Sequence, residues 1–160
     1  MNNAGITRDA IFHKMTPEEW HAVIDVNLNS VFNTCHCVVP LMRAQESGAI
    51  VNISSTSLMG NPGQANYAAS KAAMQGFTRT MAKELGRKNV RMNIVAPAHV
   101  DTDMMRSVPP EQFASIPKRN PMQRLADPSE IASVVAFLCT EDASWVTGQT
   151  IYASGGVTCS

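Results

Sequence analysis

A tyrosine and a lysine one helical turn apart are the residues of this chain best suited to chemistry. The surrounding pattern predicts a helix from Tyr67 to Leu85, in which Tyr67 and Lys71 stand at i and i+4 and share one face. A phenol titrates near 10, so proton transfer near neutral pH requires its pKa to fall by about three, or roughly 4 kcal/mol. One ammonium about 4 Å away supplies that energy at an effective dielectric constant near 20. We therefore expect Lys71 to lower the pKa of Tyr67.

The pair alone is insufficient evidence, because any helix can carry a tyrosine four residues before a lysine. A short β-branched run at residues 49–53 precedes it and predicts a buried strand, which ends in four hydroxyl residues at 54–57. In an α/β sheet, ligands bind at the carboxyl ends of the strands, so hydroxyls at this point fit a site. A simple polar turn explains the same four residues equally well.

A second helix is predicted to begin at residues 16–19, where Thr-Pro-Glu-Glu forms a capping box with proline at the first helical position. Its inward positions keep helical spacing down to about Pro40: Trp20, Val23, Ile24, Asn27, Leu28, Val31, Cys35 and Val38. A buried amide without partners costs on the order of 1 to 3 kcal/mol. Asn27 therefore either ties this helix to a neighbour or serves a site, and spacing alone favours the first.

Helices and strands alternate through the rest of the chain. We expect strands at residues 90–96 and 148–153, a helix ended by Gly86, and another that begins with the capping sequence at 127–130. Residues 98–126 lack periodicity and are rich in proline and methionine, which predicts a functional loop or lid with an apolar ligand surface. The first five residues predict a turn. The alternation indicates one α/β domain over residues 1–160, with a mostly parallel sheet.

Composition excludes several classes of function. The 160 residues are 44% hydrophobic, and 13 basic residues balance 13 acidic ones without a run of like charge, so neither nucleic acid nor a membrane is an expected partner. No apolar run of membrane length and no secretory signal pattern appears, which predicts a cytoplasmic protein. Neither the histidines nor the cysteines have metal-ligand spacing, so we expect no metal site and reduced, packed thiols at Cys35, Cys37, Cys139 and Cys159.

Six motifs in order connect these elements to a known family. They are Asn-Asn-Ala-Gly at 2–5, Val-Asn-Leu at 26–28, Ile-Val-Asn-Ile-Ser-Ser at 50–55, Tyr-Ala-Ala-Ser-Lys at 67–71, Asn-Ile-Val-Ala-Pro at 93–97 and Thr-Gly-Gln-Thr at 147–150. With them the chain resembles the short-chain dehydrogenase/reductases, and in particular their 3-oxoacyl-(acyl-carrier-protein) reductase branch, which serves fatty acid biosynthesis. The resemblance implies the C-terminal portion of a Rossmann-like, doubly wound parallel sheet. The family's first strands and glycine-rich phosphate loop have no counterpart in this sequence.

The resemblance further implies a catalytic set of Asn27, a serine, Tyr67 and Lys71 in an NAD(P)H-dependent carbonyl reductase. In that scheme Tyr67 protonates the carbonyl oxygen, and the serine hydroxyl polarises it. Lys71 lowers the pKa of Tyr67 and holds the nicotinamide ribose, while Asn27 positions a water on the proton path. The loop before Tyr67 is one residue shorter than in the family, so counting back selects Ser54 whereas strand parity selects Ser55. We choose Ser55, because parity decides which way a side chain points.

The cofactor implied by the resemblance is NADP(H) in preference to NAD(H); the choice between the two stays open in the sequence, because the residues that discriminate them belong to the early strands that have no counterpart here. Its expected contacts are Asn3, Ala4, Gly5, Tyr67, Lys71, Pro97, Val100 and Thr102. The substrate is a small-molecule carbonyl or alcohol, and a 3-oxoacyl thioester, a small ketone, a sugar and a steroid-like alcohol remain open. We expect a homodimer or homotetramer. The alternative function is a non-catalytic subunit-interaction module that cannot hold a dinucleotide.

Overall fold

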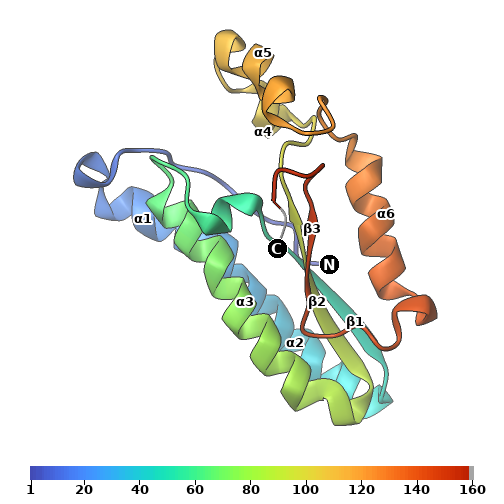
Figure 1. Ribbon diagram of the computed structural model, residues 1–160. Helices are drawn as coiled ribbons and strands as arrows, with labels where there is room; N and C mark the ends of the chain where they lie inside the picture. Colours follow the sequence, from blue (N-terminus) through green and yellow to red (C-terminus); the bar gives the residue numbers. More distant parts are fainter. Residues whose placement is uncertain (159–160) are drawn as a thin grey trace.

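A parallel sheet of three strands forms the centre of the molecule (Figure 1). The computed structural model describes residues 1–158. The strands are ordered β1-β2-β3 and comprise Gly48–Ile53, Val90–Pro97 and Thr150–Ala153. In the register Val51 lies opposite Asn93, and Ile94 lies opposite Thr150. All three strands therefore present their carboxyl ends at one edge, as the predicted α/β class requires.

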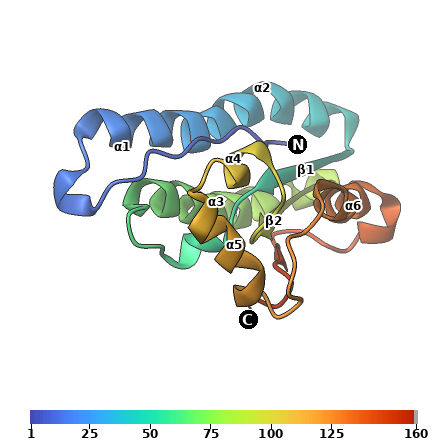
Figure 2. The ribbon, with the colours of Figure 1, turned by 90° about the horizontal axis from the view of Figure 1, so that it is seen from above.

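Helices cover both faces of this sheet, as Figures 1 and 2 show. One face carries α1 (Pro17–Ile24), α2 (Ser30–Gln45) and α3 (Ala65–Leu85), and the other carries α6 (Pro128–Cys139). Successive residues of β2 point to opposite faces, so Ile94 packs with α2 and α3 while Val95 packs with Leu138 of α6. Burial on both faces explains why the strands are continuous apolar runs. No described helix is long and apolar enough to cross a membrane.

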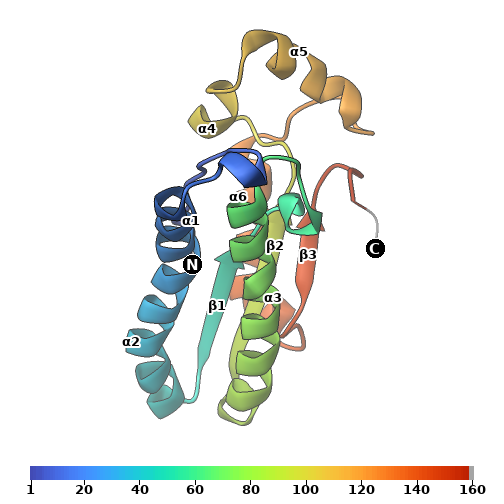
Figure 3. The ribbon, with the colours of Figure 1, turned by 90° about the vertical axis from the view of Figure 1, so that its left-hand side faces the viewer.

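The predicted loop at residues 98–126 contains two helices, which corrects the expectation of an irregular segment. They are α4 (Asp103–Arg106) and α5 (Pro110–Arg119), and Figure 3 shows both above the carboxyl ends of the strands. Proline was the reason that periodicity failed here, yet Pro110 occupies the first turn of α5, where its missing N–H is harmless. Thr102 caps α4 by accepting a hydrogen bond from Met105 N at 3.3 Å.

The helix predicted from Thr16 to about Pro40 is interrupted by a π-helical turn and continues beyond Pro40. Its capping box is confirmed: Thr16 accepts from Glu19 N, and the Glu19 carboxylate accepts from Thr16 N. After α1 the chain widens into a π-helical turn, η2 (Asp25–Asn29), before α2 continues to Gln45. Pro40 lies inside α2 and does not end it, on a side of the helix that is exposed.

The first residues are extended, where a turn was predicted. Asn2 N donates to Val51 O and Asn2 O accepts from Ile53 N, both at 2.9 Å, so this segment runs parallel to the end of β1. Gly86 ends α3 but keeps right-handed geometry, and the left-handed residue is Asn89 after the short 3-10 turn η4 (Gly86–Lys88). Further 3-10 turns are η1 (Phe12–Lys14), η3 (Thr56–Met59) and η5 (Glu141–Ala143).

The cysteines differ in their surroundings. Cys35 is buried in the core, whereas Cys37 and Cys139 are exposed. The expectation of packed thiols is therefore wrong for two of these three residues. Cys159 lies outside the described residues.

Candidate active site

Three of the expected catalytic side chains meet where β1 ends and α3 begins. Lys71 Nζ donates a hydrogen bond of 2.8 Å to the carbonyl of Ile53, the last residue of β1, and lies 5.6 Å from the centroid of the Tyr67 ring. The Ser55 side chain makes a hydrogen-bonding contact with the Tyr67 phenol. A hydroxyl, a phenol and an ammonium thus share one small region at the carboxyl edge of the sheet.

The two candidate serines point in different directions. Ser54 is buried, and its Oγ donates to the backbone carbonyl of Lys71 at 3.0 Å, which fastens β1 to α3. Ser55 is half-buried, caps the turn η3 by accepting from Ser57 N at 3.1 Å, and faces Tyr67. The alternation of side chains along an extended segment accounts for this difference. Ser55 is therefore the serine that the structure brings to the phenol.

Asn27 lies at the centre of the π-helical turn and is fully buried. Its Oδ1 accepts from Ile6 N at 2.8 Å, while its Nδ2 donates to Ile6 O at 3.1 Å and to Ser70 Oγ at 3.2 Å. The amide thus pairs with the Ile6 backbone much as a neighbouring strand would. It ties the helix to its neighbours, which is the structural role that spacing favoured. Single π turns are frequent at functional sites, and this one aims the amide toward α3.

The expected cofactor-binding residues gather at the same edge of the sheet. Gly5 lies beside two of the expected catalytic side chains, since a Cβ placed on it would be in ordinary contact with Lys71 Nζ at 3.5 Å and with Asn27 Oδ1 at 3.7 Å. Asn3 and Ala4 precede it and are exposed. Beyond the other strand, Pro97 is buried at the end of β2, Val100 forms a bridge with Ala126, and exposed Thr102 starts α4.

Burial sets the electrostatics of the pair. Lys71 is only 3% exposed, and desolvation lowers its pKa from 10.5 to about 8. Burial also raises the pKa of Tyr67 above 10; the Ser55 contact opposes this rise, and the charge of Asp9 adds to it. The expectation that Lys71 would lower the pKa of Tyr67 is therefore wrong for this structure. The desolvation of the phenolate outweighs the contact with Ser55, and the ammonium bonds to a carbonyl and not to the phenol oxygen.

Two polar residues of α3 were not singled out in the sequence, although both are fully buried beside the pair. Ser70 Oγ donates to Tyr67 O at 2.7 Å and accepts from Asn27 Nδ2, so it links the π turn to α3. Asn66 Nδ2 donates to Arg8 O at 2.9 Å and to Glu19 O at 3.2 Å. A helical signal for them exists, because residues 66, 70, 74 and 78 recur every four positions and all are buried. Polar residues at such positions predict hydrogen-bonded anchors.

Known proteins match almost the whole chain. The family model described as enoyl-(acyl carrier protein) reductase matches residues 1–158. The 3-oxoacyl-[acyl-carrier-protein] reductase of Thermotoga maritima is 49% identical over 98% of this chain and 64% of its own length. The acetoacetyl-CoA reductase of Shinella zoogloeoides is 46% identical over 98% of this chain and 66% of its own length.

A solved structure agrees with these relatives. The crystal structure of the 3-oxoacyl-[acyl-carrier protein] reductase from Brucella melitensis superposes with a TM-score of 0.94 at 39% identity, over 99% of this chain and 62% of that one. The chain thus spans somewhat less than two thirds of the first relatives it matches. By the family match, the relatives and the shared fold, the chain belongs to the short-chain dehydrogenase/reductase family.

Proposed function

We propose that this chain is the catalytic portion of a reductase that converts a carbonyl to a secondary alcohol, with NADP(H) preferred over NAD(H). The observation that carries the proposal is the convergence of Ser55, Tyr67 and Lys71 at the carboxyl edge of the sheet. The names of the relatives, 3-oxoacyl-[acyl-carrier-protein] reductase and acetoacetyl-CoA reductase, support a 3-oxoacyl thioester as the substrate class.

Tyr67 is the proposed proton donor. Because burial raises its pKa above 10, the phenol is protonated at neutral pH, and this is the form that can give a proton to a carbonyl oxygen. The Ser55 hydroxyl, next to the phenol, is placed to donate a hydrogen bond to the same oxygen as negative charge develops on it. The two groups would therefore act together on one substrate atom.

Lys71 and its neighbours are proposed to restore that proton and to hold the cofactor. A pKa of about 8 lets the Lys71 amine both hold and release a proton near neutral pH. Asn27 fixes the Gly5–Ile6 backbone beside this amine by pairing with the N–H and the carbonyl of Ile6. Bound NADP(H) would supply the hydride. The residues that fit it are Asn3, Ala4, Gly5, Tyr67, Lys71, Pro97, Val100 and Thr102, which border one edge.

The test uses the purified 160-residue chain. Titration with NADPH and, in parallel, NADH should change the fluorescence of the reduced nicotinamide, with tighter binding of NADPH. Addition of acetoacetyl-CoA should then consume NADPH at a rate proportional to protein concentration. If neither cofactor binds at millimolar concentration, these residues do not hold a dinucleotide by themselves, and the interaction-module alternative replaces the reductase for this chain.

We also propose that the chain self-associates through α2 and α3, as a homodimer or homotetramer. An apolar groove of about 230 Å³ runs between these helices, lined among others by Phe32, Val39, Phe77 and Met81. Phe32, which lines this groove, is 56% exposed, and exposed apolar side chains beside an apolar groove are typical of a protein–protein contact. Sedimentation should show a dimer or tetramer that Phe32→Glu converts toward monomer. A wild-type chain that sediments as a monomer at high concentration would exclude this association.

A further inference from the structure

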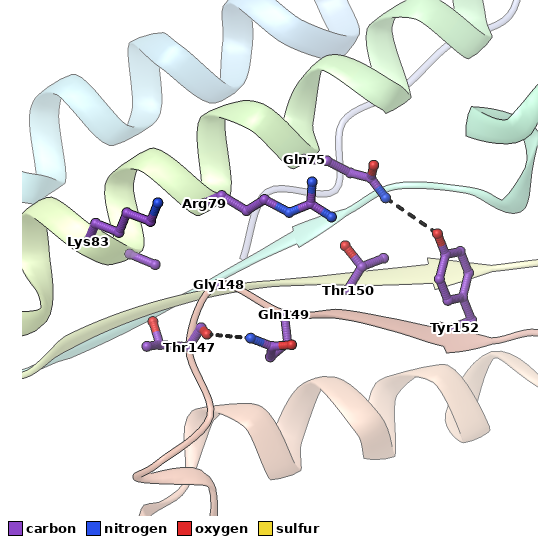
Figure 4. A pocket seen from close by; sticks show the side chains of 9 residues that line it. Gln75, Arg79, Lys83, Thr147, Gly148, Gln149, Thr150 and Tyr152 are labelled. Atoms are coloured by element: carbon purple, nitrogen blue, oxygen red, sulfur yellow. Dashed lines mark hydrogen bonds between the residues drawn. The ribbon is translucent and has the colours of Figure 1, made fainter. Parts of the chain in front are cut away.

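A polar groove lies between α3 and β3, and its lining does not include Ser55, Tyr67 or Lys71, which together are called the Tyr67 cluster. Its volume is about 530 Å³, which falls within the range of small-molecule sites. Figure 4 shows Gln75, Arg79 and Lys83 along the α3 side, and Thr147, Thr150 and Tyr152 along the other. Gly148, Gln149 and Ala82 complete the lining, so no acidic side chain borders the groove.

Two cations in the groove lack counter-charges. Arg79 and Lys83 stand one helical turn apart on α3, and like charges at that spacing repel each other. Within residues 1–158, neither side chain makes an ion pair or a hydrogen bond. By contrast, Lys88, Arg106 and Arg124 each pair with a carboxylate. The Arg79–Lys83 pair is therefore a concentration of positive charge that the protein itself leaves uncompensated.

The opposite wall supplies neutral hydrogen-bond donors. Gln75 Nε2 donates to Tyr152 Oη at 3.3 Å, which leaves the phenolic hydrogen free to donate elsewhere. Thr147 Oγ1 accepts from Met92 N at 3.2 Å, so its own hydrogen is likewise free. The Thr150 hydroxyl has no partner within the described residues and lies on the same wall. Cations on one side thus face hydroxyl donors on the other.

Such a set of donors suits an oxyanion. Arginine offers a planar fork of N–H groups that matches phosphate and carboxylate, and hydroxyls donate to the remaining oxygens. We infer that the groove between α3 and β3 binds a small organic oxyanion, a phosphate ester or a carboxylate, held by Arg79 and Lys83. The volume of the groove exceeds that of a bare phosphate, which leaves room for an organic body beside the charged group. This inference does not rest on the proposed reductase activity.

Inorganic pyrophosphate and citrate serve as the two probes, and calorimetry on the full chain measures their binding. The variant Arg79→Gln/Lys83→Gln should raise the dissociation constant about tenfold or more, since it removes charge-assisted hydrogen bonds. The matched control Arg43→Gln/Lys118→Gln removes the same charge from other exposed positions and should change it less than about twofold. The probe that binds more tightly identifies the phosphate or the carboxylate class.

Additional measurements test whether binding occurs specifically in this groove. Thr150→Val preserves shape and removes one hydroxyl, so it should weaken binding about threefold. Binding should persist in the presence of NADPH, because the groove is separate from the Tyr67 cluster. Equal weakening in the two double variants would show diffuse attraction and overturn the inference, as would no binding of either probe at 50 mM (roughly the weakest affinity worth calling a site). Loss of binding on self-association would assign the groove to a second copy and overturn it as well.

Discussion

The two halves of α3 each carry a lysine, and the two lysines lie in opposite environments. Near its start, Lys71 is 3% exposed, bonds to the Ile53 carbonyl and has a pKa lowered to about 8. Three turns later, Lys83 is exposed and without a partner beside Arg79. Both pairs, Tyr67 with Lys71 and Arg79 with Lys83, have the same four-residue spacing. Spacing therefore brings side chains together, but burial decides whether they become reactive.

Exchanging each tyrosine for phenylalanine should separate the candidate active site from the groove most clearly. Tyr67→Phe removes the proposed proton donor, so the turnover of a 3-oxoacyl thioester should fall by roughly 10² to 10⁴. Tyr152→Phe removes the other tyrosine, which lies in the groove, and should leave turnover nearly unchanged. Steady-state rates of NADPH oxidation give both values. Equal losses for the two variants, or none for Tyr67→Phe, would remove the proposed role of Tyr67.

Replacing each lysine by methionine should reveal the cost of burial. The Lys71 pKa is 10.5 in the unfolded chain and about 8 in the folded one, which corresponds to about 3 kcal/mol of destabilisation below pH 8. Between pH 8 and 10.5 the folded state has released the proton that the unfolded state still binds, so stability rises with pH. Lys71→Met should abolish this rise and stabilise the fold at pH 7 by about 1 to 3 kcal/mol, after loss of the bond to Ile53 O.

Lys83→Met is the matched control for that measurement. Its side chain is exposed and unpartnered, so the free energy of unfolding should change by less than about 0.5 kcal/mol. Urea unfolding at pH 7 and pH 9.5 compares the two variants. If Lys71→Met lowers the free energy of unfolding at pH 7, the buried ammonium does not destabilise the fold. The proposed difference between the two lysines would then be wrong.

Two asparagines of the π turn offer a smaller test. Asn27→Ala leaves the N–H and the carbonyl of Ile6 without their side-chain partner in a buried region, and Ser70 keeps only its bond to Tyr67 O, so the change should cost about 1 to 3 kcal/mol of unfolding free energy. Asn29 is exposed and bonds only to Asp25 at 2.7 Å, so Asn29→Ala should cost less than about 0.5 kcal/mol. Chemical denaturation of both variants checks the order. Equal costs would mean that the Ile6 segment is held by other contacts.

The smallest effect is expected in the groove. Arg79→Gln relieves repulsion with Lys83 and should leave the fold unchanged or more stable by up to about 0.5 kcal/mol. Thermal unfolding in low salt measures this change, and added salt should diminish it because screening weakens the repulsion. A clear destabilisation would indicate that the Arg79 guanidinium stabilises the fold and is not left unpaired to bind a ligand.

Local patterns predicted most of the architecture. The capping boxes at Thr16 and Asp127, the helix that carries Tyr67 and all three strands agree with the structure, because each depends on neighbouring residues. Strand parity also selected Ser55, the serine that contacts Tyr67. The catalytic roles assigned through the resemblance stay predictions.

What the sequence did not reveal depends on distant contacts. The π turn at Asp25–Asn29 forms where Asn27 meets Ile6 and Ser70, and no local pattern announces it. The upward shift of the Tyr67 pKa arises from burial by surrounding segments, which spacing within one helix cannot measure. The helices α4 and α5 were missed because proline disrupts periodicity even where it starts a helix.

The wide turn at Asp25–Asn29 also sets a limit on engineering. Val23, Asn27, Val31 and Cys35 are all buried, although a repeat of four over twelve residues would drift by about 120° around a straight α-helix. The wider π-helical turn compensates for part of that drift, so the buried residues of α1 and those of α2 both face the core. Shortening this turn by one residue would give a more regular α-helix. The apolar residues before the turn and those after it would then point in different directions, and only one set could face the core.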